Sequence, residues 1–343
     1  MNNPAIAIAD GEYSENIIHR AGRPLLGTWR LARDGKVIDS VNAGTFAPRP
    51  AEIVYPGTTA LIFNVSSGFY HFLMDVSSHI ANLYRHRTHF GIERVVIAAE
   101  EPVYAKSVLE DLFPDFRDRI VWAVAPFRAE RLVVSHAVPI YVYDETGAID
   151  PAGVRQNARA LRISSETMEA QHALFQVVDD EPGRFIADTP GPGAAGSSVV
   201  YIPRRGKREL QNEDRLLAAL APLKPDVLAM ESLSAAEKVR ALRKARVIIG
   251  PHGAGLSNAG FAEKGATIVE LTSRHYIKND RLPLYNGRLA ALREAAYHFV
   301  VADEEGEVFD PKGVGNGTDV VAGDKAIETV LGIAEAALTG VPA

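Results

Sequence analysis

A glycine-rich turn after an apolar segment constrains the fold of this chain more than any other feature. Residues 247–249 are typical of a buried strand, and Gly250, Gly253 and Gly255 follow within the next turn. Residues 256–262 then favour a short helix whose first amides point back at the turn. Such a helix start offers unpaired N–H donors and about half a positive charge, so it can hold a phosphate.

The residues of this turn are therefore candidate ligand contacts: His252, Gly253, Ala254, Gly255, Leu256, Ser257 and Asn258. The next apolar segment, residues 267–271, contains Glu270 near its end. A carboxylate in that position can accept hydrogen bonds from two neighbouring ribose hydroxyls. A phosphate site followed by a ribose site indicates a nucleotide ligand.

Apolar and helical segments alternate along most of the chain, which favours an α/β fold of parallel sheets covered by helices. We expect strands over residues 59–64, 95–99, 120–124, 131–143, 199–202, 226–230, 267–271 and 297–302. We expect helices over residues 69–86, 105–112, 154–175, 212–221, 235–244, 281–296 and 324–338. The first ~50 residues give only weak strand signals.

Two domains fit the length and composition of the chain. Its 343 residues are 47% apolar, which is enough for two cores of ordinary size. Residues 179–198 contain two Pro-Gly pairs in a row and are the most linker-like segment. We therefore expect an N-terminal α/β lobe over residues 1–180 and a C-terminal lobe over residues 181–343, closed by a final helix.

Charge and composition exclude several classes of function. The net charge is -6 and no long basic stretch is present, which argues against a nucleic-acid partner. The absence of cysteine excludes disulfides and thiolate-bound zinc. The N-terminus lacks the features of a secretory signal, and no apolar run approaches the ~20 residues of a membrane span. We expect a cytoplasmic protein without a transmembrane segment.

Three separated blocks of the chain, taken together, resemble glycosyltransferase family 61. They are Phe69-Tyr70-His71-Phe72 with Asp75, then Tyr201-Ile202-Pro203-Arg204-Arg205 with Arg208 and Asn212-Glu213, then residues 251–258 with Gly265-Ala266 and Glu270. One departure is visible at Pro203, where the family often has Ser. Proline removes a hydroxyl and an N–H beside the expected diphosphate.

This resemblance implies an inverting glycosyltransferase of the GT-B architecture, with two facing Rossmann-like lobes and an interlobe cleft. The C-terminal lobe would bind a nucleoside diphosphate sugar, of the UDP type, and the N-terminal lobe a saccharide or glycoconjugate acceptor. No cofactor is implied. Bacterial members are associated with capsule or surface polysaccharide synthesis, and the sequence leaves open a lipid-linked acceptor reached by peripheral contact with a membrane.

Arginines are the candidate groups for neutralising the leaving diphosphate. The sequence contains no Asp-x-Asp that would anchor a metal ion, so we expect no metal site. Arg204 and Arg205 follow an expected strand, and a guanidinium suits phosphate oxygens. Arg208 is a third candidate. The alternative interpretation is that the first two are solvated surface charges, whereas Arg208 anchors and Asn212 caps the following helix.

His71 and Asp75 are the candidate catalytic pair. Their spacing of four residues places both on one face of a helix, where the carboxylate can orient the imidazole. A histidine held in this way suits removal of a proton from the acceptor hydroxyl near neutral pH. The alternative is that His71 packs in the core while Asp75 caps the helix or pairs with Arg85.

Two other functions remain open at this point. Gly253-Ala254-Gly255 begins the Gly-x-Gly-x-x-Gly pattern of an NAD(P)-dependent Rossmann oxidoreductase, although Asn258 replaces the third glycine. Glu270 also follows Gly255 by about 15 residues rather than the usual ~20. A non-catalytic nucleotide- or carbohydrate-binding protein of the same fold is the second alternative. Thermal-shift screening against sugar nucleotides and dinucleotides separates the transferase from the oxidoreductase, and detection of product separates it from the binding protein.

Overall fold

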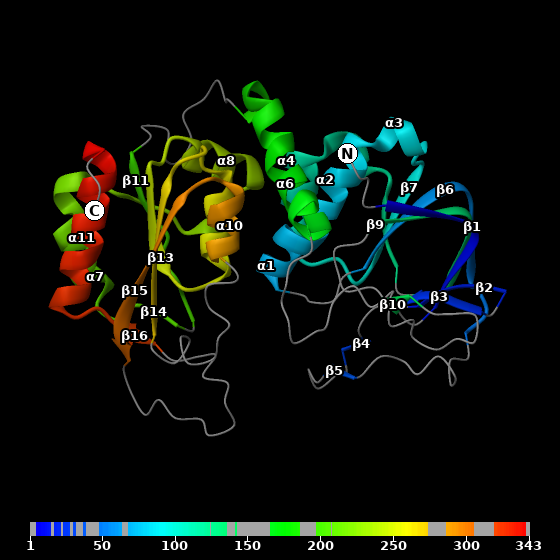
Figure 1. Cartoon of the computed structure of the whole chain (residues 1–343), viewed down its shortest axis with the longest axis horizontal. Helices are drawn as coiled ribbons and strands as arrows, with labels where there is room; N and C mark the ends of the chain where they lie inside the picture. The colour runs from blue at the N-terminus through cyan, green and yellow to red at the C-terminus, as the bar shows by residue number, and fades with distance from the viewer. Residues whose placement is uncertain are drawn as a thin grey trace. The chain divides into compact units, whose positions relative to one another are not determined.

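The chain forms two compact units, Met1–Val177 and Val178–Ala343. This computed structural model describes residues 5–14, 17–21, 23–27, 30–31, 37–38, 48–63, 68–123, 125–135, 141–142, 165–185, 197–206, 208–273, 286–304 and 319–340. Each unit is a helix-covered sheet in Figure 1. We describe each one by itself.

The first unit contains a mixed sheet of eight described strands in the order β10-β3-β2-β1-β9-β6-β7-β8. Four strands, β9, β6, β7 and β8, run parallel, whereas β1, β2, β3 and β10 pair antiparallel. In chain order the strands are β1 (Ala5–Ser14), β2 (Ile17–Arg20), β3 (Arg23–Gly27), β6 (Ile53–Phe63), β7 (Arg94–Ala98), β8 (Ile120–Trp122), β9 (Phe127–Ser135) and β10 (Tyr141–Val142). A separate ribbon pairs β4 (Arg30–Leu31) with β5 (Val37–Ile38).

The antiparallel half corrects the expectation of a purely parallel, Rossmann-like first lobe. Three of its strands come from the first residues of the chain, where the strand signal is weak. Strand β1 contains small residues and a glycine, and a Cβ at Gly11 would lie 2.8 Å from Leu132 Cβ on the neighbouring strand. The close approach of the two strands therefore leaves no room for a larger side chain at position 11.

A long helical segment follows β6 in the first unit. It consists of α1 (Phe69–His71), the π-helical segment η2 (Phe72–Ser77) and α2 (Ser78–Arg85), which confirms the helix expected over residues 69–86. The other helices are α3 (Arg87–Phe90), α4 (Ala105–Leu112), α5 (Pro114–Arg117) and α6 (Ser165–Asp180). Residues 64–67 and most of the N-terminal half of the helix expected over 154–175 lie outside the described residues.

The second unit contains a six-stranded sheet in the order β12-β11-β13-β14-β15-β16. All neighbouring strands are parallel except β16, which pairs antiparallel with β15. The strands are β11 (Val199–Tyr201), β12 (Asp226–Val227), β13 (Val247–Pro251), β14 (Thr267–Ser273), β15 (Ala296–Glu304) and β16 (Val320–Val321). Strand β12 is shorter than expected, because the chain turns into a 3-10 segment, η5 (Met230–Ser232).

Helices cover both faces of this second sheet. In Figure 1, α7 (Glu213–Leu220) and α11 (Asp324–Thr339) lie on one face, and α8 (Ala235–Arg243) and α10 (Asn286–Leu292) lie on the other. Short 3-10 segments, η3 (Pro182–Phe185), η4 (Ala221–Leu223) and η6 (Ala254–Phe261), complete the unit. Helix α10 is shorter than the helix expected over residues 281–296, of which 281–285 lie outside the described residues.

Strand order in the second unit identifies where a ligand would bind. From β11 the chain crosses to β12 on one side, and it then returns past β11 to β13 on the other side. The carboxyl ends of β11 and β13 therefore flank the point at which the winding reverses. In open α/β sheets, ligands bind in the crevice outside the strands at this position.

None of the helices in the described part of the chain combines the length and the apolar composition that a bilayer crossing requires.

Candidate functional site

Arg204 and the glycine turn meet where the winding of the second sheet reverses. Arg204 follows β11 and the turn follows β13, and these two strands are parallel neighbours. A Cβ built on Gly253 would lie 1.4 Å from Nη1 of Arg204, so the guanidinium occupies the space beside this glycine. The absence of a side chain at Gly253 is therefore what lets Arg204 lie across the turn.

Gly250 has a second steric role at the same place. A Cβ on Gly250 would lie 2.7 Å from the backbone oxygen of Ile202, so any larger residue would push β13 away from the end of β11. The backbone N–H of Ile202 donates to the Ile249 oxygen at 2.8 Å. Glycines at 250 and 253 thus keep the two segments close enough to act on one ligand.

The helix after the turn is the 3-10 helix η6, which starts two residues earlier than the predicted helix. Ser257 Oγ donates to the Ala254 oxygen at 2.6 Å, and Asn258 Nδ2 donates to the Gly255 oxygen at 2.7 Å. The backbone N–H of Leu256 donates to the Gly253 oxygen at 3.1 Å. These hydrogen bonds stabilise the turn itself. The ligand contacts predicted for Leu256, Ser257 and Asn258 stay predictions.

Glu270 lies in the middle of β14 and is completely buried. One carboxylate oxygen contacts Nδ1 of His252, and the other accepts hydrogen bonds from Asn286 Nδ2 at 2.8 Å and from the Tyr297 hydroxyl at 2.7 Å. The sequence predicted a ribose ligand for this carboxylate. Three protein groups contact its oxygens, and the ribose contact stays a prediction.

Sequence reasoning missed Asn286 and Tyr297 as members of this network. The register pairs Ile268 of β14 with Tyr297 of β15, so the side chains of Tyr297 and Glu270 project from the same face of the sheet. Burial and the Glu270 carboxylate raise the pKa of the Tyr297 hydroxyl above its usual value, so it stays a donor. Only the strand register could have revealed this contact.

Arg205 lies near Arg204 in sequence but has a different partner. Its guanidinium donates to both carboxylate oxygens of Glu213, at 3.0 and 2.8 Å, and Tyr201 also donates to Glu213 at 3.1 Å. The pair ties the loop after β11 to the first turn of α7. A diphosphate contact by Arg205 remains a prediction, and it competes with this fork-shaped ion pair.

Arg208 and Asn212 complete the loop. The backbone of Arg208 has a φ of 59°, a left-handed conformation that is uncommon for residues other than glycine. Asn212 occupies the N-cap position of α7, as predicted, but its side chain makes no capping hydrogen bond. Its side chain instead donates to the Ala322 oxygen at 2.8 Å and accepts from the Ala322 N–H at 2.9 Å, so it joins this loop to the segment before α11.

The candidate catalytic pair lies in the first unit. His71 Nδ1 and the Asp75 carboxylate are 2.7 Å apart, and their side chains are 38% and 24% exposed. Asp75 is the only residue of the π-helical segment η2 that is not buried. The predicted contact between the two residues is confirmed, and π-helical segments are frequent at functional sites.

A carboxylate at Nδ1 favours the imidazole tautomer that carries its hydrogen on Nδ1 and its lone pair on Nε2. In this tautomer His71 can accept a proton at Nε2. Within the described residues, no group of three or more His, Asp or Glu side chains is arranged to hold a metal ion.

A family model and several known proteins match the sequence of this chain. The model of the family described as Glycosyltransferase 61 matches residues 69–269 of the chain. The match begins at the helix that carries His71 and ends one residue before Glu270. It covers more than half of the chain and confirms the resemblance seen in the three sequence blocks.

Three curated relatives carry transferase names. The EGF domain-specific O-linked N-acetylglucosamine transferase of Drosophila melanogaster is 26% identical over 230 residues, covering 64% of this chain and 41% of that protein. The Protein O-linked-mannose beta-1,4-N-acetylglucosaminyltransferase 2 of Xenopus tropicalis is 36% identical over 86 residues (24% and 15%). Its Bos taurus counterpart is 27% identical over 147 residues (41% and 24%). The chain spans less than half the length of these relatives.

A solved flavodoxin structure from Streptococcus pneumoniae TIGR4 covers 42% of this chain and 97% of its own, with 14% identity and a TM-score of 0.27. That score is too low to establish a shared fold.

Proposed function

The chain belongs to the glycosyltransferase 61 family, and from this premise we propose that it moves a sugar from a nucleoside diphosphate sugar to a hydroxyl of a saccharide or glycoconjugate. The proposed transfer inverts the anomeric centre and uses no metal ion. The observation that carries the proposal is the position of Arg204 across Gly253, at the place where a doubly wound sheet binds its ligand.

Leaving-group stabilisation is assigned to the second unit. As the bond between the sugar and the diphosphate breaks, negative charge grows on the phosphate oxygens. The Arg204 guanidinium lies beside Gly253 at the start of η6, and in this proposal it stabilises that charge together with the amides there. Arg205 and Arg208 are proposed as outer contacts, weaker than Arg204, because Glu213 already holds the guanidinium of Arg205.

His252 is proposed as a donor contact that Glu270 positions. The buried carboxylate fixes the imidazole through Nδ1, and Asn286 and Tyr297 fix the carboxylate in turn. A ligand contact made by a side chain held in this way loses little conformational entropy on binding. In this assignment Glu270 acts on the donor through His252 rather than by touching the ribose.

Proton removal is assigned to the first unit. The acceptor oxygen attacks the anomeric carbon from the face opposite the diphosphate while its proton passes to Nε2 of His71. Asp75 stabilises the imidazolium that forms. The new glycosidic bond replaces the bond to the diphosphate, the nucleoside diphosphate leaves, and the proton later returns to solvent.

UDP-N-acetylglucosamine is the donor that we would test first. The names of the curated relatives describe transfer of N-acetylglucosamine to EGF domains or to O-linked mannose. Those relatives are animal proteins, so the link with capsule or surface polysaccharide gains no support from them. The donor base and sugar are part of this proposal.

The test is a donor screen by mass spectrometry with mixed acceptor saccharides, run with and without a chelator. We expect product from one sugar nucleotide, with the anomeric configuration inverted, and the same rate with chelator present. Loss of product on chelation would contradict the metal-free mechanism. A thermal shift with NAD(P) and none with any sugar nucleotide would favour the oxidoreductase instead.

Arg204→Ala is the sharpest variant for this test, with Arg205→Ala as its matched control. We expect turnover to fall roughly 10²- to 10³-fold for the first, which is typical for loss of one well-placed oxyanion donor. The loss for Arg205→Ala should be clearly smaller. Near-normal turnover of folded Arg204→Ala would remove arginine neutralisation from the mechanism.

A further inference from the structure

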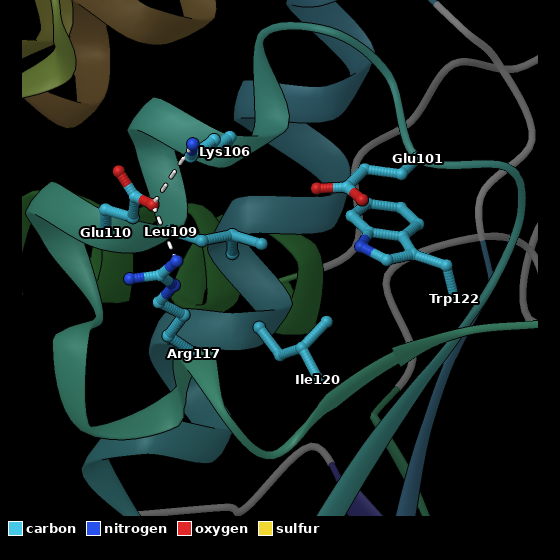
Figure 2. Close-up of a pocket in the computed structure, with 7 residues that line it drawn as sticks. All are labelled: Glu101, Lys106, Leu109, Glu110, Arg117, Ile120 and Trp122. Atoms are coloured by element: carbon cyan, nitrogen blue, oxygen red, sulfur yellow. Dashed lines mark ion pairs between the residues drawn. The ribbon is translucent and has the colours of Figure 1, made fainter.

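A pocket in the first unit lies apart from the groups used so far. Its volume is about 230 Å³. Figure 2 shows Glu101 and Trp122 on one side, Lys106, Glu110 and Arg117 on the other, and the apolar side chains of Leu109 and Ile120 between them. It is smaller than the ~300 to 1,000 Å³ of sites for drug-sized ligands, so a single ring is the size that suits it.

The pocket runs along the edge strand β8, and one end of it lies at the carboxyl edge of the parallel half of the sheet. Trp122 is the last residue of β8, and Glu101 follows the end of β7 by three residues. The helix with His71 and Asp75 follows β6, the next strand along. Because β6, β7 and β8 are parallel, their carboxyl ends share one edge, and this edge is where open α/β sheets bind ligands.

Aromatic contacts connect the pocket to the candidate catalytic pair. The Trp122 ring stacks with Phe72 at 6.3 Å between centroids, and Phe72 is the residue directly after His71. Tyr104 contacts the same Phe72 ring at 5.4 Å. The tryptophan that lines the pocket therefore contacts the first residue of η2.

The charges in the pocket cancel. Arg117 Nη2 lies 3.0 Å and Lys106 Nζ 4.0 Å from Oε1 of Glu110, as the dashed lines in Figure 2 indicate, and Glu101 supplies the second carboxylate. Two acids and two bases leave no net charge to attract an ionic ligand. They offer acceptors and donors around a flat apolar ring and an apolar floor.

We propose that this pocket binds one neutral sugar ring. The C–H face of a pyranose is apolar and can lie on the Trp122 indole, while its hydroxyls donate to Glu101 and Glu110 and accept from Lys106 and Arg117. The role of this sugar as part of the acceptor rests on the proposed function, because the pocket shares its sheet edge with His71. The binding itself does not depend on transfer.

The test measures binding to the whole chain by saturation-transfer NMR and calorimetry. The probes are three neutral methyl glycosides: methyl β-glucopyranoside, methyl α-mannopyranoside and methyl N-acetyl-β-glucosaminide. Methyl β-glucuronide and uridine are the charged-sugar and nucleobase comparisons. We expect saturation transfer to at least one neutral glycoside and a stronger signal than for either comparison.

Glu101→Gln should weaken this binding roughly ten-fold, as expected for loss of a charge-assisted hydrogen bond. Glu100→Gln is the matched control, since Glu100 is the exposed neighbour that does not line the pocket, and it should bind like the wild type. Trp122→Leu should abolish the signal. Circular dichroism checks its fold, and if it unfolds the Glu101 and Glu100 variants alone decide the question.

Every result of these binding experiments either supports or contradicts the proposed sugar site. No glycoside binding, equal binding by the Glu101 and Glu100 variants, or preference for uridine or the glucuronide would overturn it. Transfer of sugar with no binding at the pocket would leave the proposed function in place and remove this inference. If the protein binds a glycoside through Glu101 but transfers no sugar, this inference stands and the proposed function is contradicted.

Discussion

Both units hold a histidine against a carboxylate, His252 against Glu270 in the second and His71 against Asp75 in the first, but burial separates the two pairs. Glu270 is completely buried and accepts from Asn286 and Tyr297 as well as contacting His252. The side chains of His71 and Asp75 are both partly exposed. The same pairing of a histidine with a carboxylate therefore occurs in two different physical environments.

A buried, fully hydrogen-bonded carboxylate fixes geometry, because moving any partner leaves a polar group without a hydrogen bond. A partly exposed pair costs less to rearrange and can exchange protons with solvent and substrate. We infer that the second unit uses its pair for positioning and that the first unit uses its pair for proton transfer. The predictions below test this division, from the largest expected effect to the smallest.

His71→Ala should show the largest effect. Removing a general base typically costs roughly 10²- to 10⁴-fold in rate, so we expect transfer to be nearly abolished while donor affinity stays at its wild-type value. Turnover assays and calorimetry with the donor measure the two quantities. His89→Ala, at an exposed position in α3, is the control and should retain transfer. Lost donor affinity with unchanged chemistry would reverse the assigned role.

Asp179→Asn tests whether the second unit depends on buried ion pairs. Arg293 is 1% exposed and donates to Asp179 at 2.7 Å, and Arg243 donates to the same carboxylate at 2.7 Å. The variant leaves the buried Arg293 charge without its carboxylate, with only the Ala262 oxygen still accepting from it at 2.6 Å, so we expect a loss of up to about 3–5 kcal/mol in the free energy of unfolding. Urea denaturation measures it. The exposed Arg215–Asp324 pair is the control, and Asp324→Asn should cost at most about 1 kcal/mol.

The same carboxylate predicts a pH dependence. Burial alone would raise the pKa of Asp179, but hydrogen bonds and charge from Arg293 and Arg243 outweigh it and lower this pKa below its usual value. The stabilisation is therefore complete above the unfolded pKa of about 3.9 and is lost as pH falls through the lower folded pKa. The stability difference between wild type and Asp179→Asn should shrink over that acid range. A difference that stays constant with pH would contradict the ion-pair explanation.

Glu270→Gln and Asp75→Asn compare the two pairs directly. Glutamine places an amide donor where Glu270 only accepts, so we expect a loss of about 1–3 kcal/mol in unfolding free energy together with weaker donor binding. Asp75→Asn should change stability by less than about 0.5 kcal/mol and mainly lower turnover. Denaturant titration and steady-state kinetics on both variants give the four values. Equal stability losses would remove the distinction between the pairs.

The sequence predicted the second unit better than the first for a physical reason. Its central strands β11, β13 and β14 are buried on both faces, so they are continuous apolar segments such as residues 247–249, and the glycine turn is local in sequence. The first unit owes half its sheet to antiparallel strands, which are short or interrupted by small and charged residues. Their pairing depends on distant partners, such as Gly11 with Ala129, which no local pattern reveals.

Some contacts of the candidate site were likewise predicted from the sequence and others were not. The contact between His71 and Asp75 follows from helical spacing and was predicted. The partners of Glu270 were not predicted, because they depend on how separate elements come together. The side chain of Arg205 contacts Glu213 rather than the turn. Local spacing predicts contacts within one element, whereas contacts between elements require the register of the sheet.

Tyr297→Phe should give the smallest effect and is the finest test of positioning. The change removes one hydrogen bond to Glu270 but leaves Asn286 and His252 in place, so we expect a loss of about 0.5–1.5 kcal/mol in unfolding free energy. Tyr201→Phe is matched to it, because it removes a hydroxyl that donates to Glu213 from the end of β11. If Glu270 holds His252 for the donor, only the Tyr297 variant should also weaken donor binding in calorimetry. An equal loss of affinity in both variants would mean that the network supports the unit as a whole and that His252 has no special position in it.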